Sequence, residues 1–317
     1  ITGPIDVPGL SHPITSENYR YILTYTIESK FEGYEDPKKI LKNFAPLFQK
    51  RLLQKVHAQA IQRAMLEEIL SKNIVAYSRS TDIQNFFETL GMDGAVKQTG
   101  EKEDYLGIVL TSFGGNKSDA NMSQKVVHST FFDLNGEIIN DLTIERKHLW
   151  NDSEFQKWKS ALAAFGYKDF PPHIVNVLGQ GDNKSAVRVY VPDGAVLQST
   201  TGIEIEKVAA VADQNLGKTY FSFDFLVPSG QTKEITLTYV LPFQLNTDPV
   251  DAYKFQLQKQ PGMRPYEFEK NIYRNELLKL HKKYPEALVE DKKGSINFKT
   301  LVNKDYYLAT LWGKIRQ

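Results

Sequence analysis

The residues with the clearest potential for chemistry form a polar loop, Gly114-Gly115-Asn116-Lys117-Ser118-Asp119. Glycine, lysine and serine in this order are similar in type to a phosphate-binding loop, where backbone amides and a lysine hold phosphate oxygens. That loop has the spacing Gly-x-x-x-x-Gly-Lys-Ser/Thr and opens directly into a helix. Here a strand is expected next, so we predict a polar β-loop. Its six residues, Gly114, Gly115, Asn116, Lys117, Ser118 and Asp119, are the candidate binding site for a phosphate or a sugar.

The segment Gly179-Gln180-Gly181-Asp182-Asn183-Lys184-Ser185 has a spacing closer to that motif. Its lysine leads into a strand expected at Val187, and a strand offers no helix N-terminus to hold a phosphate. We therefore interpret this segment as a connection that precedes a strand.

The sequence offers few residues that could bind a metal ion or act as a nucleophile. There is no cysteine, which excludes disulfides, thiolate metal sites and cysteine nucleophiles. The six histidines do not have the three- or four-residue spacing of a helical metal site. His128 and His148 flank one expected hairpin, but their unequal distances from its centre argue against direct pairing. We predict no metal and no cofactor.

Candidate catalytic sets are equally weak. No Gly-x-Ser-x-Gly motif presents a serine nucleophile, and Ser118, Asp119 and His128 are the only such residues close together in the sequence. Glu67 and Glu68 are neighbours on an expected helix, so their carboxylates point about 100° apart and cannot share a substrate. We predict no catalytic residues.

Aromatic residues are abundant, at 12% of the chain. Clusters such as Tyr19-Tyr21-Tyr25, Phe131-Phe132 and Tyr306-Tyr307 would suit a carbohydrate-stacking or protein-binding surface, because tyrosine combines an apolar face with a polar tip. The favoured interpretation is that alternating aromatic residues fill a core between sheets.

The element that must position the polar loop is a sheet around the stretch from Ser185 to Phe243. Apolar and polar residues alternate there, and Pro-Asp-Gly and Pro-Ser-Gly separate the runs. This pattern is typical of antiparallel strands with one buried face. Strands are also expected over 105–112, 125–134 and 137–149, with a type I′ turn at Asn135-Gly136.

Helices are expected mainly in the first 100 residues. Asp36-Pro37 begins one helix that Pro46 interrupts, and others follow over 57–72 and 82–90. Tyr19 to Glu28 is rich in β-forming residues and is interpreted as a strand or a helix-to-strand segment. A short amphipathic helix is expected at Ser153 to Phe165, a strand over 253–259, and a further helix from about Asn271 within 267–284.

The predicted fold is therefore α+β: a mainly helical N-terminal part followed by an antiparallel, Ig-like β-sandwich with a helical insertion. The expected parts are 1–100, the mainly helical part; 101–262, the sandwich with the insertion at 153–166; and 263–317, a C-terminal helix and strand extension packed on the sandwich.

Composition restricts the partners. At 317 residues, 41% hydrophobic and 24% charged, the chain has the balance of a soluble globular protein. Its 39 basic and 38 acidic residues give no overall field that would attract nucleic acid or an anionic membrane. No apolar run approaches the length of a membrane span. The chain starts with Ile1 instead of Met, so we interpret it as part of a longer protein, with any membrane attachment through an anchor outside it.

A resemblance to a known family is carried by stretches that occur in this order: Thr2 to Pro8, Thr15 to Asn18, Asp36 to Lys38, Asp82 to Gln84, Asp93-Gly94, Asp104 to Leu106, Phe113 to Asp119, Val189 to Gly194 and Gln258 to Gly262. Over residues 1 to 262 they resemble a bacterial family known as domain of unknown function 4012, found in actinobacteria and ultra-small candidate-phylum bacteria. The resemblance implies an envelope protein with a large region outside the cytoplasmic membrane, of which this chain matches the second half. It departs from the family in the insertion near residue 153 and the tail after Gly262.

The resulting hypothesis is a non-catalytic, extracytoplasmic module at the bacterial cell surface, acting in envelope structure, attachment or assembly. Its expected partners are the missing N-terminal half, another copy paired through exposed strand edges, or other envelope proteins. Two alternatives remain. One is part of an enzyme that processes cell-wall glycan or its lipid-linked precursors, with the catalytic groups mostly in the missing half. The other is a carbohydrate-binding module that takes a surface glycan.

Overall fold

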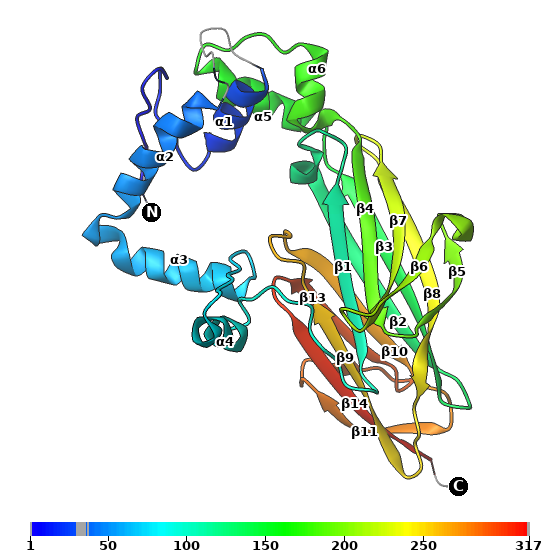
Figure 1. The fold of residues 1–317 in the computed structure, drawn as a ribbon. Coiled ribbons are helices and arrows are strands. Elements are labelled where there is room, and N and C mark those ends of the chain that lie inside the picture. Colours follow the sequence, from blue (N-terminus) through cyan, green and yellow to red (C-terminus); the bar gives the residue numbers. More distant parts are fainter. Residues whose placement is uncertain (1, 30–35, 37, 316–317) are drawn as a thin grey trace.

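The computed structural model describes residues 2–29, 36 and 38–315. It is a mixed α+β protein in which helices arch over one end and one side of a body made of two sheets (Figure 1). The helices are α1 (Tyr19–Glu28), α2 (Lys39–Leu52), α3 (Ala58–Leu70), α4 (Thr81–Thr89), α5 (Asp152–Ala163) and α6 (Pro172–Val175). Short helical turns occur at η1 (Lys55–His57), η2 (Ser118–Asn121), η3 (Asn176–Gln180) and η4 (Ile205–Lys207).

Each sheet has seven strands in the described part of the chain. The first sheet runs in the order β11 (Leu278–Tyr284), β14 (Tyr306–Lys314), β9 (Val250–Gln258), β1 (Asp104–Ser112), β4 (Asn183–Pro192), β7 (Lys218–Val227) and β6 (Ala209–Asp213). The second sheet runs in the order β12 (Val289–Glu290), β13 (Ile296–Val302), β10 (Tyr266–Tyr273), β2 (Met122–Phe132), β3 (Glu137–His148), β8 (Thr232–Gln244) and β5 (Val196–Thr201). We call these two sheets together the sheet body.

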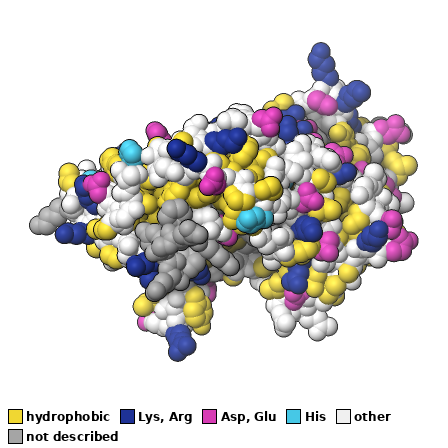
Figure 2. Space-filling model, turned by 90° about the horizontal axis from the view of Figure 1, so that it is seen from above, with side chains coloured by type: hydrophobic (Ala, Val, Ile, Leu, Met, Phe, Trp, Pro, Cys, Tyr) yellow, Lys and Arg dark blue, Asp and Glu magenta, His cyan; other side chains and the backbone are white. Residues whose placement is uncertain are grey.

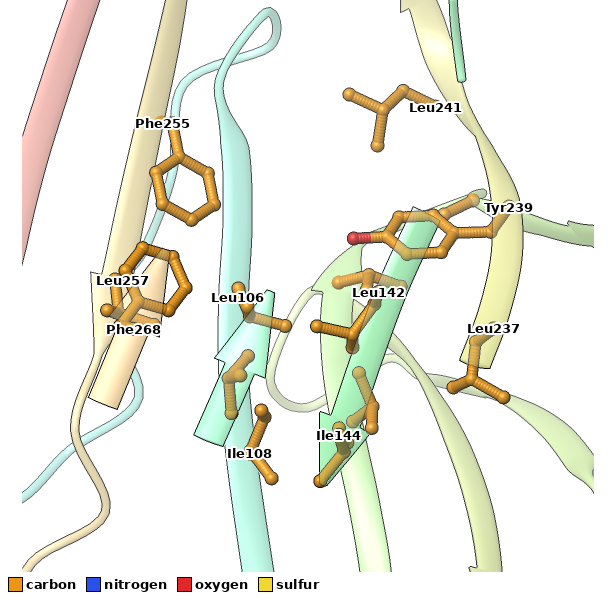
Figure 3. Packing of buried hydrophobic residues seen from close by; sticks show 14 of the residues in the cluster. Leu106, Ile108, Leu142, Ile144, Leu237, Tyr239, Leu241, Phe255, Leu257 and Phe268 are labelled. Atoms are coloured by element: carbon orange, nitrogen blue, oxygen red, sulfur yellow. The ribbon is translucent and has the colours of Figure 1, made fainter. Parts of the chain in front are cut away.

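The two sheets face each other across one continuous apolar core. Along β3, buried and partly buried positions alternate, as expected for a strand with one inward face. Figure 3 shows inward side chains from both sheets meeting between the layers, among them Leu106, Ile108, Leu142, Ile144, Leu237, Tyr239, Leu241, Phe255, Leu257 and Phe268. The alternation seen in the sequence from Ser185 to Phe243 therefore corresponds to real strands, of which β4, β7 and β8 are the longest.

The expectation of purely antiparallel sheets is wrong at one place in each sheet. β1 pairs with β9 in parallel, and β2 pairs with β10 in parallel. These two pairs join strands of residues 104–244 to strands of residues 250–314, so that two sets of strands lie side by side and share both sheets. Parallel neighbours cannot be linked by a tight turn, and here more than a hundred residues separate the paired strands.

The expected helix from about Asn271 is also wrong. Residues in this region form β10 and β11, and 263–315 contains no helix among the residues described. Tyr266, Phe268, Lys270 and Ile272 are buried at every second position, so the period of 2 prevails over the lysine- and glutamate-rich composition. The tail is thus a set of strands within both sheets.

Tyr19 to Glu28 is the helix α1, which corrects the expectation of a strand. Ile22, Tyr25 and Thr26 are its buried residues, at helical spacing. Thr15 and Asn18 hydrogen-bond to each other in the turn before α1: the Thr15 amide donates to Asn18 Oδ1 at 2.8 Å, and the Asn18 amide donates to Thr15 Oγ1 at 3.3 Å. Packing against α5 outweighs the β propensity of the sequence.

The turn between β2 and β3 differs from the predicted type I′ turn. It is a four-residue connection from Asp133 to Gly136 in which Gly136 has a positive φ of 85° and Asn135 does not. Asp133 Oδ1 accepts hydrogen bonds from the amides of Asn135 at 2.9 Å and Glu137 at 2.7 Å. The aspartate side chain therefore organises the turn.

The remaining helices behave largely as expected. α5 lies in the predicted insertion, and its cap is Asn151, whose Oδ1 accepts from the Glu154 amide at 2.9 Å. α2 continues through Pro46, and Pro37 lies outside the described residues. α1, α5 and α6 share a small apolar core that includes Trp158 and Leu178 at the end of the sheet body.

Seen from that end, apolar side chains gather near the centre of the face, and charged side chains of both signs are scattered around them (Figure 2). This distribution agrees with the balanced composition. Among the described helices, none combines the length and the apolar character needed to cross a lipid bilayer.

Candidate functional site

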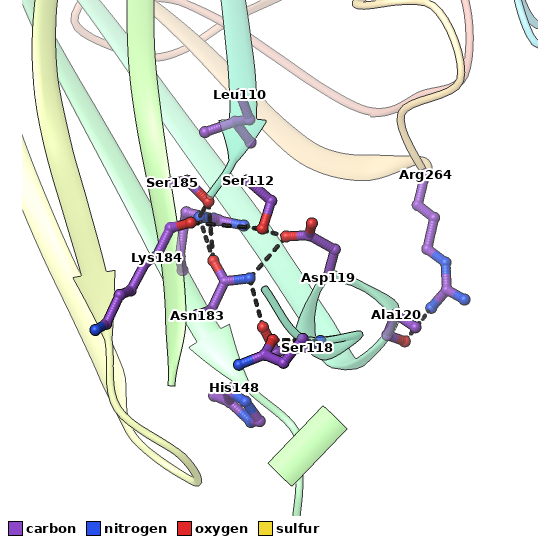
Figure 4. A network of polar contacts seen from close by, with 12 residues as sticks. Leu110, Ser112, Ser118, Asp119, Ala120, His148, Asn183, Lys184, Ser185 and Arg264 are labelled. Carbon is purple, nitrogen blue, oxygen red and sulfur yellow. Dashed lines mark hydrogen bonds and ion pairs between the residues drawn. The ribbon is translucent and has the colours of Figure 1, made fainter. Parts of the chain in front are cut away.

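The predicted loop from Gly114 to Asp119 connects β1 in the first sheet to β2 in the second. It passes through the turn η2 and enters a strand, as predicted. Ser118 is fully buried, and its Oγ accepts from Asn183 Nδ2 at 3.0 Å. The same Asn183 amide donates to Asp119 Oδ1 at 2.7 Å. Figure 4 shows Asn183 lying between Ser118 and Asp119.

Of the other four loop residues, Asn116 contacts this pair, because its Oδ1 accepts from the Ser118 amide at 2.9 Å. Gly114 and Asn116 line a shallow depression of about 400 Å³ beside Asp182, and a Cβ added at Gly115 would meet open space. Lys117, the expected phosphate or sugar ligand, forms an ion pair with Glu28 at 3.2 Å. The six loop residues therefore have different surroundings, and the loop as a binding site stays a prediction.

A second connection between the sheets lies beside this loop. Residues 259–265 link β9 to β10, as 113–121 link β1 to β2. The Gln260 side chain accepts from the Leu110 amide at 2.9 Å and donates to the Leu110 carbonyl at 3.1 Å. Arg264 donates to the Ala120 carbonyl at 2.6 Å, across from the turn η2 (Figure 4). These contacts hold the two connections side by side.

A depression of about 460 Å³ lies between the two connections. Asp119 and Arg264 stand at it together with Gln124 and Arg146, and Met122, Met263 and Tyr266 supply apolar surface. Gln124 and Arg146 are direct neighbours across the β2–β3 ladder. They are in the inward phase of their strands, one inward pair before Met122 and His148 at the end of the ladder.

Arg146 is 2% exposed and makes few contacts for a buried guanidinium. Its Nη1 donates to Asn183 Oδ1 at 2.9 Å and to Ser185 Oγ at 3.0 Å, and its Nη2 lies 4.0 Å from Asp119 Oδ1. Burial lowers the pKa of Arg146 to about 10, and the Asp119 carboxylate opposes that shift. The guanidinium is therefore cationic at neutral pH.

Sequence reasoning missed Arg146 and Gln124, although a signal was present. Ile138, Leu142 and Ile144 mark the inward phase of β3, and Arg146 continues that phase. A charged residue in the inward phase of a strand is uncommon unless it is paired or functional. Following the phase to the end of the strand would have identified it.

The most extensive buried polar cluster lies elsewhere, where the parallel strands join. Lys270 Nζ contacts His128 Nδ1 at 2.9 Å and Tyr253 OH at 3.0 Å, and it also donates to Thr130. Tyr253 in turn donates to Asp104. All five residues are at most 1% exposed, so no solute reaches them. This cluster is part of the core.

His128 lies on β2 and His148 on β3. His128 lies opposite Leu142 and His148 opposite Met122, which confirms that the two imidazoles do not pair. His148 contacts the Gly181 carbonyl at 3.1 Å. Within the described residues, no three histidine, aspartate or glutamate side chains are grouped so as to hold a metal ion.

The residues of the predicted aromatic clusters are divided between the interior and the surface. Tyr25 packs in the core beneath α1, and Phe132 packs in the sheet body. Tyr307 is 42% exposed and lies 6.4 Å from the exposed Tyr284 between ring centroids. Tyr19, from another of the predicted clusters, is also exposed, at 52%.

Comparison with solved structures gives likenesses at low sequence identity. No family model matches, and no curated protein matches. Similar solved structures include a candidate nutrient-binding protein of Legionella pneumophila, with a TM-score of 0.37 and 8% identity over 66% of this chain and 72% of that one. An M1 zinc metallopeptidase of Deinococcus radiodurans has a TM-score of 0.27 and 9% identity over 63% of this chain and 43% of its own. These likenesses are too low to support an inference about activity.

Proposed function

We propose that this chain is a non-catalytic assembly module of the bacterial envelope, which associates with a second copy through helices α2, α3 and α4. The observation that carries the proposal is the apolar surface of these helices. Neither α3 nor α4 buries any of its described residues. An amphipathic helix normally buries its apolar stripe against another element.

The exposed residues are large. Leu66, Leu70 and Phe86 are 57%, 61% and 58% exposed, and they belong to a wider set on the same three helices and their connections: Leu41, Phe48, Leu53, Val56, Met65, Val75, Tyr77, Ile83 and Leu90. Single exposed apolar residues are ordinary, but a run of them over consecutive helices is typical of an association surface. Figure 1 shows α2 and α3 as an arch beside the sheet body, with α2 leading away from it and α3 leading back. We call this surface the helical arm.

Charge favours a second copy as the partner. α2 carries four basic and no acidic residues, namely Lys39, Lys42, Lys50 and Arg51. α3 and α4 together carry one basic and four acidic residues: Arg63, Glu67, Glu68, Asp82 and Glu88. A two-fold arrangement that places α2 of one copy along α3 and α4 of the other brings opposite charges together at both ends.

Three of the four edge strands, β12, β5 and β11, are less suited to assembly than the sequence suggested. β12 has two residues, and the pairing of β5 and of β11 shifts register within the strand. β11 also carries Lys279, Lys282 and Lys283. Short, irregular and lysine-rich edge strands are the devices by which proteins prevent edge-to-edge pairing. The proposal therefore moves the contact from the edges to the helical arm.

The envelope location and the Ig-like character of the sheet body belong to the proposal. The location is supported by the resemblance to domain of unknown function 4012 and by the absence of cysteine. The Ig-like character is supported by the two sets of strands, 104–244 and 250–314, each of which contributes to both layers.

Sedimentation equilibrium of the purified chain tests this function. We expect a dimer at about 10 μM that weakens as salt is raised, because the contact combines apolar and charged groups. The double change Leu66→Gln and Phe86→Gln should give a monomer with unaltered thermal unfolding. Leu134→Gln, at the exposed β2–β3 turn, is the matched control and should remain dimeric. A wild-type monomer at about 100 μM, or a dimer that survives the double change, would refute the proposal.

A further inference from the structure

The depression between the two sheet-crossing connections has a feature that neither the fold nor the helical arm explains. Arg146 Nε and Gln124 Oε1 are buried atoms that make no hydrogen bond with any described group. Both side chains line the depression, and the residues are 2% and 8% exposed. Buried polar atoms are nearly always paired, and an unpaired one costs about 1–3 kcal/mol.

The unpaired atom of Arg146 belongs to a particular edge of the guanidinium. Nη1 is engaged by Asn183 and Ser185, whereas Nε makes no hydrogen bond and Nη2 stands 4.0 Å from Asp119, beyond hydrogen-bond distance. Nε and Nη2 together form the side of the guanidinium that binds a carboxylate through two parallel hydrogen bonds. Asn183 and Ser185 hold the opposite side, so this edge is fixed in orientation.

The neighbouring Gln124 adds a second requirement. Its Oε1 is an acceptor that lies beside Arg146 on the adjacent strand, so it would take a hydrogen bond from an N–H or O–H group next to the carboxylate.

The net charge of the residues that line the depression indicates the charge of the ligand. Arg146 and Arg264 carry two positive charges and Asp119 one negative charge, which suits a monoanion better than a phosphate dianion.

We propose that this depression binds a small carboxylate that carries a hydrogen-bond donor on or next to its α-carbon, such as an N-acyl amino acid or a uronic acid. The carboxylate accepts from Arg146 Nε and Nη2, and the adjacent N–H or O–H donates to Gln124 Oε1. Met122, Met263 and Tyr266 provide apolar contact for the rest of the ligand. The site does not depend on the proposed assembly, because the helical arm contributes none of these residues.

Isothermal titration of the chain tests the site with defined probes. N-acetylglycine and D-glucuronate both supply the carboxylate and the donor, and they distinguish an amide from a sugar source. Acetate lacks the donor, N-acetylglycinamide lacks the carboxylate, and inorganic phosphate supplies a different anion. We expect at least one of the first two to bind with a dissociation constant of about 1 mM or tighter, and about tenfold more tightly than the three controls.

Variants assign the binding to the named atoms. Arg146→Lys keeps the charge and loses the two-donor edge, so affinity should fall about tenfold or more. Gln124→Met removes an acceptor that has no partner, so the fold should be retained while the preference for N-acetylglycine or D-glucuronate over acetate disappears. Lys184→Ala, outside the depression, is the control and should bind like the wild type.

The possible results separate clearly. If Arg146→Lys fails to fold, the proposal is tested by Gln124→Met alone, which should lose the preference for N-acetylglycine or D-glucuronate over acetate. Binding of no carboxylate at about 10 mM, tighter binding of phosphate, or a preference unchanged by Gln124→Met would overturn the proposal.

Discussion

Lys270 is the position where a single substitution should cost this protein most. It lies on β10 beside the parallel pairing with β2, fully buried. Its ammonium has three acceptors in His128 Nδ1, Thr130 Oγ1 and Tyr253 OH, which use all three of its protons. Lys270→Met keeps most of the aliphatic chain and removes the amine, whose pKa burial lowers to about 7, together with these hydrogen bonds.

The loss of stability expected for Lys270→Met is estimated from Asp104, the acidic residue to which Lys270 is linked through Tyr253. The Asp104 carboxylate accepts from the Tyr105 amide at 2.8 Å, from Asn140 Nδ2 at 3.1 Å and from Tyr253 OH. Burial raises the pKa of Asp104, and the charge of Lys270 opposes that rise. Removing one partner of a buried pair costs about 3–5 kcal/mol. Because whole proteins are stable by about 5–15 kcal/mol, Lys270→Met should lie near the limit of folding.

Urea unfolding at pH 7 measures the effect, with Asp104→Asn and the double variant completing a cycle. The double variant should lose about 1–3 kcal/mol less than the sum of the single changes, because each single change leaves the other charge unpaired. Lys299→Met is the matched control, since its exposed ion pair with Glu269 at 3.0 Å contributes at most about 1 kcal/mol. Additivity within about 0.5 kcal/mol, or a loss for Lys270→Met no larger than for the control, would refute the reasoning.

Two further substitutions test the core and the β2–β3 turn. Burial, and to a lesser extent the charge of Lys270, lowers the pKa of His128 well below 6.5. Below pH 6.5 the unfolded chain therefore binds a proton at this histidine that the folded chain does not. The free energy of unfolding then falls by up to about 1.4 kcal/mol for each pH unit. His128→Asn should flatten the fall in urea midpoint between pH 7 and 5, and an unchanged slope would contradict this. Gly136→Ala should destabilise by about 2 kcal/mol or more in the same assay, because φ is 85° and the new Cβ would lie 2.2 Å from the Leu245 carbonyl oxygen. A neutral effect would show that the turn relaxes.

The sequence identified most strands because a half-buried strand has a period of 2 that is visible locally. It failed where two local signals disagreed. Tyr19 to Glu28 has β-forming residues, but α1 is a helix because Ile22 and Tyr25 pack against the insertion helix α5. The lysine- and glutamate-rich segment after Glu267 has a helical composition, but its inward residues alternate. In both segments the packing of one face decides the structure, and composition does not record it.

The candidate site could be predicted from the sequence only in part, for a different reason. The sequence identified the loop that contains Asp119, and this residue does stand at the depression. Arg264 lies far along the chain, in a tail that was expected to pack on the outside of the sandwich. Its approach to Ala120 depends on the parallel pairing of β2 with β10, which is a non-local contact with no periodic signature. A single sequence contains no information from which that pairing can be read directly.

The parallel joins explain why the depression and the buried polar cluster occur in the same molecule. β1 and β9 run in the same direction, so both leave the first sheet at the same end, and β2 and β10 both enter the second sheet there. The two connections must then lie side by side, and Gln260 and Arg264 fasten them together. If the strand sets 104–244 and 250–314 had paired through antiparallel strands, the connections 113–121 and 259–265 would have lain at opposite ends of the sheets. Arg146 would then face no second connection. The Asp104–Lys270 cluster lies in the core at the same two parallel strand pairs, because its residues come from β1, β9, β2 and β10. We therefore expect loss of the cluster to loosen the contact between the halves and to weaken carboxylate binding even though Arg146 itself is unchanged.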